Sequence, residues 1–404
     1  MRRSARIRSA ISHCMSRISL RTVDSLAQIA PGSWDALVAD RPLVSHAFLH
    51  ALHETGCASP ETGWTPRYLT AWRGDTLVGA MPLYLKAHSY GEYIFDWSWA
   101  DAYRRHGRRY YPKLLSAVPF TPATGPRLIA AENATRRQLL SGALALVAEA
   151  RLSSLHILFP ESAEAAECAA AGMLLRDSVQ FHWTNPGYRD FSDFVSTMNH
   201  AKRKKIRQER TRLAGAGVSF RRLLGSQIEP RHWAFFFRCY TTTYRRHFST
   251  PYLSLEFFQR IGATMPDNLL LVLGERDGTP VCAALDVFSH DTLWGRYWGA
   301  REYVPGLHFE ACYYQAIEFC IERRIVQFEG GAQGVHKLAR GLLPVTTRSA
   351  HAIADPDFAH AIARFTSDER AEVAQTVEEL EEASPFKRSE PHGDEAAANE
   401  GRQA

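Results

Sequence analysis

The chain has 404 residues, of which 45% are hydrophobic and 23% charged, and its formal net charge at pH 7 is +5. This length predicts two or three domains with hydrophobic cores, and so small a net charge does not by itself identify a nucleic-acid binder. No apolar run approaches the roughly 18–20 residues of a membrane-spanning helix, and the 7 cysteines form no CxxC pair. We therefore expect a cytoplasmic protein without a transmembrane segment.

The chain begins with a basic segment. Residues 1–22 hold arginines but no acidic residue, which is typical of a transit peptide or a loose tail; we favour the tail because no cleavage signal is evident. A helical pattern follows over residues 33–54. There His46, His50 and His53 share one face at a spacing that metal ligands use, but no fourth ligand is near. We expect a structural or substrate-facing cluster and no metal.

Residues 66–100 are rich in predicted strands, with a hairpin turn at Arg73-Gly74-Asp75. After these strands, ionisable side chains lie among aromatic residues. This pattern favours a polar substrate cleft lined by aromatic side chains. The alternative is a half-buried sheet with a solvated polar face. The residues concerned are Lys86, His88, Glu92 and Asp96. Periodicity next predicts helices over 134–151 and 163–171 and strands over 155–159 and 179–183.

Residues 190–213 combine an apolar helical stripe with concentrated positive charge. From Lys202 to Arg212 the only acidic residue is Glu209. Such a helix could bind a polyanion, including tRNA, or could simply present a solvated face. Further on, a hairpin is predicted across Asp277-Gly278, and the polar residues 384–404 are expected to be disordered.

The stretch from Tyr297 to Pro344 predicts a strand, a tight turn, a helix, a strand and a glycine-rich loop. Apolar residues from Phe309 to Cys320 recur on one helical face. Gly306 lies just before the helix, where free N–H groups and the helix dipole favour an anion. A phosphate or carboxylate site and an ordinary turn are both compatible with this pattern.

Two ordered matches suggest an internal duplication. Residues 74–85 (GDTLVGAMPLYL) align with 277–288 (DGTPVCAALDVF), and residues 97–103 (WSWADAY) align with 297–303 (YWGAREY). The offset between the paired segments is nearly constant. We therefore expect two copies of one α/β unit.

These segments resemble the Gcn5-related acetyltransferase (GNAT) fold in tandem, as in the Fem-type aminoacyl transferases of peptidoglycan cross-bridges. The sequence is most similar to the FemAB-like predicted N-acyltransferases, the "peptidoglycan biosynthesis/recognition" branch. The resemblance covers roughly residues 20–385 and is carried by HAFLHALHETG, GWTPRYLTAW, MPLYLKAHSYGEYIFDWSWADAY, YYPKLLSAVPFTPATGPRL, MNHAKRKKIRQER, YWGAREYVPGLHFEACYYQAIEFCIERR and EGGAQGVHKLARGLLP.

The resemblance implies an α/β (α+β) protein with mixed sheets flanked by helices. It places a first GNAT-like unit at 23–189, a second at 190–383 that opens with the basic helix, and a tail at 384–404. It also implies transfer of an acyl or aminoacyl group from an activated carrier to an amine, on a peptidoglycan-related or small-molecule acceptor.

The identity of the acyl donor stays open, because the sequence departs from the GNAT pattern at one loop. The loop that holds the coenzyme A pyrophosphate in GNAT enzymes corresponds here to residues 301–306, which contain a single glycine. No tightly bound cofactor is expected, and the co-substrate is acyl-CoA or aminoacyl-tRNA. The residues expected to contact it are Arg301, Gly306 and Leu307.

Acyl transfer to an amine needs placement of both substrates, a proton acceptor and donors for the developing oxyanion. We expect direct attack without a covalent intermediate, because no Gly-x-Ser-x-Gly elbow or Cys/His pairing appears. Glu310 or Glu329 is the expected base, with His308 or His336 as the alternative. The remaining candidates, expected to bind substrate, are Tyr297, Lys337 and Arg340.

Two other interpretations stay open. The chain could be a non-catalytic recognition module for cell-wall fragments or RNA, which the basic helix favours. It could also be a small-molecule N-acetyltransferase that uses acetyl-CoA through the shortened loop. The density of ionisable residues in the two predicted clefts favours an enzyme.

Overall fold

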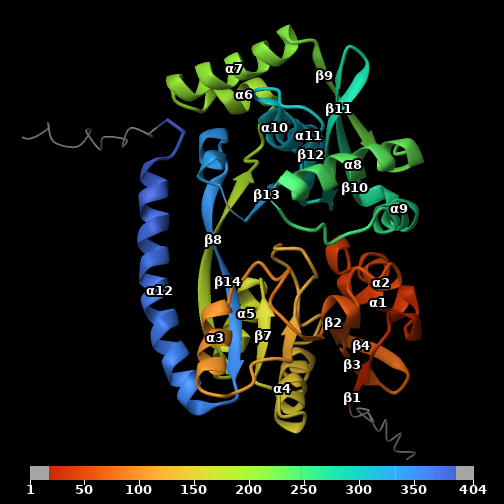
Figure 1. Ribbon diagram of the computed structural model, residues 1–404, viewed down its shortest axis with the longest axis vertical. Helices are drawn as coiled ribbons and strands as arrows, with labels where there is room; N and C mark the ends of the chain where they lie inside the picture. The colour runs from red at the N-terminus through yellow and green to blue at the C-terminus, as the bar shows by residue number, and fades with distance from the viewer. Residues whose placement is uncertain (1–17, 247, 333, 388–404) are drawn as a thin grey trace, which may run out of the picture.

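The computed structural model describes residues 18–246, 248–332 and 334–387 and shows a mixed α/β protein. Its strands form one sheet of 11 strands and a separate antiparallel sheet of three. Figure 1 shows two lobes, the lower from the first part of the chain and the upper from the second, with helices against the sheets. The predicted fold class, mixed sheets flanked by helices, is confirmed.

The first part of the chain contains the predicted hairpin of β3 (Tyr68–Arg73) and β4 (Thr76–Met81), which joins β1 in the three-stranded sheet. The Ser45 hydroxyl starts α2 by accepting the Phe48 N–H, so that Leu49 and Leu52 enter the core. The other elements are β1 (Ile18–Val23), α1 (Pro31–Val38), α2 (His46–Glu54), β2 (Trp64–Pro66), β5 (Tyr84–Lys86), α3 (Trp97–Arg105), β6 (Lys113–Ser116), α4 (Asn133–Glu149), β7 (Ser154–Leu158), α5 (Ser162–Ala170) and β8 (Leu174–Thr184).

The second part repeats the order of hairpin, strand, helix and strand. A π-helical turn, Glu310–Tyr314, connects α10 to α11, and a 3-10 helix, Val335–Arg340, follows β13. The elements are α6 (Phe191–Ser196), α7 (His200–Gly215), β9 (Val218–Leu224), α8 (Pro230–Arg246), α9 (Leu255–Thr264), β10 (Leu269–Arg276), β11 (Thr279–Phe288), β12 (Thr292–Ala300), α10 (Leu307–Phe309), α11 (Gln315–Arg323), β13 (Gln327–Ala332), β14 (Leu343–Ile353) and α12 (Pro356–Glu382).

The two parts of the chain exchange strands at the middle of the large sheet. Its order is β2-β5-β6-β7-β14-β8-β13-β12-β11-β10-β9. The late strand β14 lies antiparallel between β7 and β8, with Ala350 opposite both Ile157 and Leu175. The early strand β8 lies between β14 and β13. Each half of the sheet is therefore completed by a strand from the other part of the chain.

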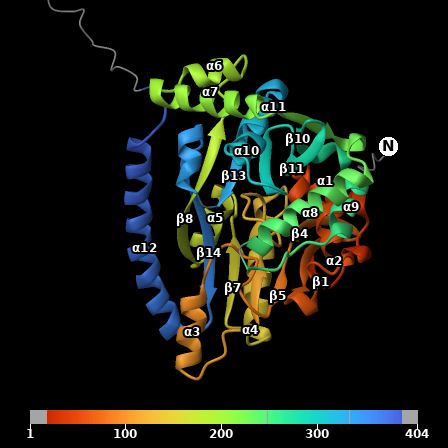
Figure 2. The ribbon, with the colours of Figure 1, turned by 45° about the horizontal axis from the view of Figure 1, so that its top comes forward.

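The helix α12 runs along the exchanged strands β8 and β14 in both views (Figures 1 and 2). Arg176 on β8 makes two hydrogen bonds of 2.7 Å to the Glu369 carboxylate. At the other end, Phe358 stacks on Tyr103 of α3 with ring centroids 3.9 Å apart. The helix thus fixes the exchanged strands to the first unit. No helix in the described part of the chain has the length and apolar character needed to cross a membrane.

Several sequence predictions are confirmed and others need correction. The hairpins at 73–75 and 277–278 are present, and they correspond as the repeat predicts. The second half of the alignment is wrong, because residues 97–103 lie in helix α3 whereas their partners lie in β12 and the loop after it. Strand β14 was not predicted, since its core carries the polar run Thr346–Ser349, which resembles a loop.

The ends of the chain also differ in detail from the predicted tails. Residues 18–22 of the predicted N-terminal tail form most of β1, which pairs with β3. At the C-terminus the Pro385 carbonyl accepts the N–H of Asn199, and Phe386 contacts Phe194. The rest of both predicted tails, 1–17 and 388–404, lies outside the described residues. Asn199 also divides the predicted helix 190–213, because it caps the start of α7 by accepting the Lys202 N–H.

The exchanged strands predict that the first unit does not fold alone. A fragment of residues 18–189 lacks β14, so the edges of β7 and β8 would have no partner strand. We expect this fragment to aggregate or to unfold without cooperativity in thermal melts followed by circular dichroism. The full chain under the same conditions is the control, and a cooperative, reversible transition of the fragment would contradict this interpretation.

Candidate active site

Strands β12 and β13 separate partway along their length. They pair in parallel only at three positions, Thr292–Gln327, Leu293–Phe328 and Trp294–Glu329. Beyond these pairs each strand continues, but the two no longer exchange ladder hydrogen bonds. Ligands of open α/β sheets bind where neighbouring strands diverge at their carboxyl ends. A ligand site is therefore expected where β12 and β13 separate.

A cavity lies on each side of this separation. The first, the helix-side cavity, has a volume of about 480 Å³ and lies under α10 and the π-helical turn. The second, the loop-side cavity, has a volume of about 370 Å³ and lies under α8. Both are lined by the same parts of the two strands, which are Gly295, Arg296, Tyr297, Trp298 and Gly330. One substrate can thus approach the strands from each side.

The first unit supplies one wall of the loop-side cavity. Tyr93, Phe95 and Pro122 from the first unit line it together with residues of α8. The Arg296 guanidinium donates a hydrogen bond of 2.7 Å to the Phe120 carbonyl, and the Tyr297 hydroxyl donates one of 3.3 Å to the same oxygen. The site therefore depends on the contact between the two units.

The corresponding position in the first unit is filled by protein. Strands β6 and β7 also pair in parallel at three positions, but the segment 117–128 then packs into the space beyond them. Its Arg127 is 1% exposed and donates to the carbonyls of Leu158 and Ala123 at 2.9 and 2.8 Å. The Glu164 carboxylate accepts the N–H groups of Arg127 and Leu128. In the second unit the corresponding position is bordered by the two cavities.

Four of the predicted site residues line the helix-side cavity: Tyr297, His308, His336 and Lys337. Burial lowers the pKa of His308 to about 4, and burial also lowers the pKa of His336, whose Nε2 lies 3.1 Å from the Tyr313 hydroxyl. Both imidazoles are neutral at pH 7. Burial lowers the pKa of Lys337 to about 8, so this side chain is still mostly a cation at pH 7. Its Nζ donates to the Gly331 carbonyl at 2.8 Å.

Two other predicted residues, Glu310 and Arg340, face α7 and do not line either cavity. The Arg210 guanidinium donates two hydrogen bonds, of 3.1 and 2.8 Å, to the Glu310 carboxylate. Arg340 donates to Glu209 at 2.7 Å, and its guanidinium lies over the Phe309 ring. These pairs attach α7 to the helix beside the cavity. Their geometry favours a structural role for both side chains.

The three predicted cofactor contacts also lie outside both cavities. Gly306 has a φ of +89°, which the turn before α10 requires and which L side chains rarely adopt. A Cβ there would lie 3.6 Å from the Leu213 side chain of α7, so this helix covers the turn. Leu307 is buried, and Arg301 is exposed.

Glu329 is buried at the end of the paired part of β13. Its carboxylate accepts hydrogen bonds from the Gln327 side chain at 3.1 Å and from the Thr124 N–H at 3.4 Å. Burial raises its pKa to about 7. The side chain lines neither cavity, but it links β13 to the first-unit segment that forms the cavity wall.

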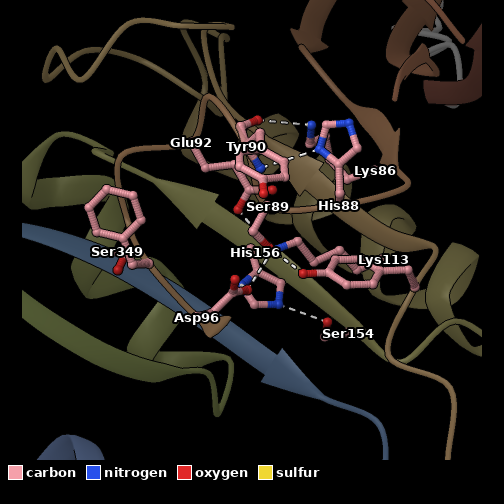
Figure 3. A network of polar contacts seen from close by, with 12 residues as sticks. Lys86, His88, Ser89, Tyr90, Glu92, Asp96, Lys113, Ser154, His156 and Ser349 are labelled. Atoms are coloured by element: carbon pink, nitrogen blue, oxygen red, sulfur yellow. Dashed lines mark hydrogen bonds and ion pairs between the residues drawn. The ribbon is translucent and has the colours of Figure 1, made fainter. Parts of the chain in front are cut away.

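The ionisable residues predicted in the first unit form a closed network around Lys113 (Figure 3). The Lys113 ammonium donates to Ser89 at 2.9 Å, to Glu92 at 2.8 Å and to Asp96. All four side chains are buried. Burial raises the pKa of Glu92 to about 7 despite the nearby ammonium. Sequence patterning missed Lys113, which lies 17 residues or more from its partners.

Lys86 and His88 lie at the edge of the same network. The Lys86 ammonium is 3.8 Å from the centre of the Trp64 ring, and burial lowers its pKa to about 7. His88 accepts the Tyr90 N–H at 3.3 Å. Neither residue lines the helix-side or the loop-side cavity. The predicted first-unit cleft is thus a buried polar core in this structure.

The three histidines of α2 have separate partners. His46 lies 3.0 Å from the Leu26 carbonyl, and His53 lies 3.1 Å from the Tyr68 hydroxyl. His50 faces the Glu54 carboxylate at 3.4 Å. Among the described residues no group of three His, Cys, Asp or Glu side chains has the arrangement of a metal site.

One further ionisable residue of the helix-side cavity, Asp286 on β11, was not identified from the sequence. It is 2% exposed, and within the described residues its Oδ2 has no hydrogen-bond partner. Burial raises its pKa well above the ordinary range. A single acid within the apolar strand VCAALDVF was the available signal, because charged residues are rarely buried without a partner.

Comparison with known proteins identifies the family of this chain. The FemAB-like family, described as peptidoglycan biosynthesis/recognition, matches residues 25–388. The chain belongs to this family. Among solved structures, FemX aligns at a TM-score of 0.53 and 11% identity over 85% of this chain and 100% of its own. The C-terminal domain (DUF2156) of a putative lysylphosphatidylglycerol synthetase from Agrobacterium fabrum aligns at 0.50 and 10% identity over 82% and 94%.

These two likenesses support the mixed α/β fold of the FemAB-like chain. At 10–11% identity they concern the fold alone. No curated protein sequence matches the chain at a significant level.

The network around Lys113 gives a prediction about stability. Lys113→Met leaves Glu92 and Asp96 buried without their counter-ion and should cost about 3–5 kcal/mol of unfolding free energy. The loss should shrink as pH falls, because both carboxyls can then be protonated. Urea unfolding at pH 8 and pH 5 measures this loss of unfolding free energy. The control is Lys86→Met, which removes a 3.3 Å hydrogen bond to the Tyr90 carbonyl and the contact of the ammonium with the Trp64 ring, but takes no ion pair from Glu92 or Asp96. Equal losses for the two variants would refute the assignment.

Proposed function

We propose that this FemAB-like chain is an N-acyltransferase, which moves an acyl or aminoacyl group from an activated carrier to an amine. The observation that carries the proposal is the separation of β12 and β13 with a cavity on each side. A donor on the helix side and an acceptor on the loop side would meet between the strands. Such placement supplies a large part of the rate in acyl transfer.

In the proposed reaction the acceptor nitrogen attacks the carbonyl carbon of the donor. A C–N bond forms, the bond from carbon to the carrier oxygen or sulfur breaks, and one proton moves from the amine to the leaving group. His308 is neutral and lines the cavity, so it is the proposed proton carrier, with His336 behind it. Lys337 is the proposed donor to the developing oxyanion.

The basic helix α7 supports an aminoacyl-tRNA donor. Of its seven basic residues between 202 and 212, only Arg210 forms an ion pair within the described structure. The others are left to face solvent or a groove lined by His200, Arg203, Lys204, Arg207, Gln208, Thr211 and Arg212. A larger groove of about 760 Å³ lies between α6, α7 and α11 and shares Arg207 and Thr211. The first groove is basic, whereas the larger one also holds the acidic residues Asp190, Glu318 and Glu322.

The choice between the two proposed donors can be tested by thermal shift. A ligand that binds only the folded protein raises its unfolding temperature. Acetyl-CoA and longer acyl-CoA esters form one set of ligands, and charged and uncharged tRNA the other. A salt-sensitive shift with tRNA that Lys204→Ala/Arg207→Ala reduces would favour aminoacyl transfer. A shift only with the coenzymes would favour an acyl-CoA enzyme, and no shift with either would count against the transferase proposal.

The pKa values of the cavity residues predict the pH dependence of turnover. Lys337 supports catalysis in its protonated form, so kcat/KM should fall as pH rises through about 8. His308 must be neutral, so the low-pH limit should lie near 4. Rates are corrected for the fraction of unprotonated acceptor. Lys337→Met should lower kcat by about 10²-fold or more and remove the limit near 8. A retained limit near 8 in this variant would contradict the role of Lys337.

A further inference from the structure

Among the described residues, Asp286 is the one carboxyl group that lines the helix-side cavity. It comes from β11 at a register shift in the pairing with β12, directly opposite Gly295. Because residue 295 has no side chain, the space next to the carboxyl stays open. A Cβ at this position would lie 3.6 Å from Asp286 Oδ1 and 3.2 Å from the Phe328 ring. Gly295 also lines the loop-side cavity, so the carboxyl lies beside the opening between the strands.

Two cationic side chains, Lys337 and Arg296, line the same cavity as Asp286, but both donate to backbone carbonyls. Within the described residues Asp286 forms no ion pair and its Oδ2 has no hydrogen bond. The titratable side chains around it are two thiols from the π-helical turn and α11 and the ionisable residues that line the cavity: Cys312, Cys320, Arg296, Tyr297, His308, Tyr313, His336 and Lys337. The Lys337 ammonium donates instead to the Gly331 carbonyl.

A buried carboxyl without a partner destabilises a fold, so stability does not explain why Asp286 is present. The cavity beside it provides an explanation, because a ligand can supply the missing partner. Carboxylates bind ammonium groups with charge-assisted hydrogen bonds. We propose that Asp286 binds the ammonium group of a substrate in the helix-side cavity and selects aminated over non-aminated groups there. This inference rests on the proposed function, since it names the chemical class that the same cavity accepts.

The ammonium group has two sources in an amine-acylating enzyme. It can be the α-amine of an aminoacyl donor or the amine of the acceptor before its deprotonation. L-alaninamide carries both an α-ammonium and a carbonyl, L-lactamide replaces the ammonium by a hydroxyl, and ethylamine has no carbonyl. Binding of these three probes to the full chain can be measured by ligand-observed NMR at pH 7.

We expect L-alaninamide to bind about 10- to 100-fold more tightly than L-lactamide, as one charge-assisted hydrogen bond allows. Asp286→Asn keeps the shape of the side chain and should abolish this preference. Stronger binding of alaninamide than of ethylamine would assign the bound ammonium group to the donor. Stronger binding of ethylamine would assign it to the acceptor. Gly295→Ala should weaken all probes. Equal binding of alaninamide and lactamide by the wild type, absence of binding by both, or a preference retained in Asp286→Asn would overturn the inference.

A second readout separates binding from folding. An unpaired buried carboxyl holds a proton that it releases when an ammonium pairs with it, so alaninamide binding should release about one proton. Calorimetry in buffers of different ionisation enthalpy measures this proton, and Asp286→Asn should lose it while unfolding at the same or a higher temperature. Asp101→Asn, at a half-buried aspartate of α3 that lies outside both cavities, is the matched control. If Lys337→Met abolishes transfer but Asp286→Asn leaves preference and proton release unchanged, only this inference fails.

Discussion

The strand exchange at the middle of the sheet is the constraint on which the rest of the structure depends. Strand β8 leaves the first unit to pair with β13, and β14 returns from the second unit to pair with β7. Neither unit completes its half of the large sheet from its own part of the chain. The exchange fixes the two halves relative to one another, and α12 fixes the exchanged strands from outside. The residues of a site between the units can therefore be positioned as precisely as those of a site within one domain.

The two units differ at the position beyond their parallel strand pair. In the first unit the space beyond the parallel pair β6–β7 is filled by its own segment, with Arg127 and Glu164 satisfying the buried polar groups. In the second unit the equivalent space stays open, and part of the same first-unit segment, at Phe120 and Pro122, forms its wall. One unit has thus become a support for the cavity of the other. The cavity at this strand separation is lined by His308, whose pKa burial lowers to about 4, and by Lys337, whose pKa burial lowers to about 8.

Much of the fold could be predicted because it depends on local patterns. The two hairpins follow from Gly74 and Gly278 between apolar runs, and the repeat aligned them correctly. Strand β14 could not be recognised because its place between β7 and β8 depends on partners nearly 200 residues away in the sequence, such as Ile157 opposite Ala350. The same limit affected the second half of the repeat, where tertiary packing makes residues 97–105 helical.

The site was predictable to the extent that its residues follow one another in the chain. His308, His336 and Lys337 lie in the stretch that the sequence singles out, and the fold brings them to one cavity. Glu310 and Arg340 lie in the same stretch but pair with Arg210 and Glu209 of a distant helix, which no spacing rule reveals. Asp286 was missed for the opposite reason, since its importance lies in having no partner.

The most direct test of this account is a crystal structure of the chain with the donor that gives the largest thermal shift. We expect the acyl carbonyl to lie between Gly295 and Gly330, within hydrogen-bond distance of Lys337 Nζ, with the carrier extending from the helix-side cavity. A donor bound only at α7, or in the first unit near Lys113, with the helix-side cavity unoccupied, would contradict it.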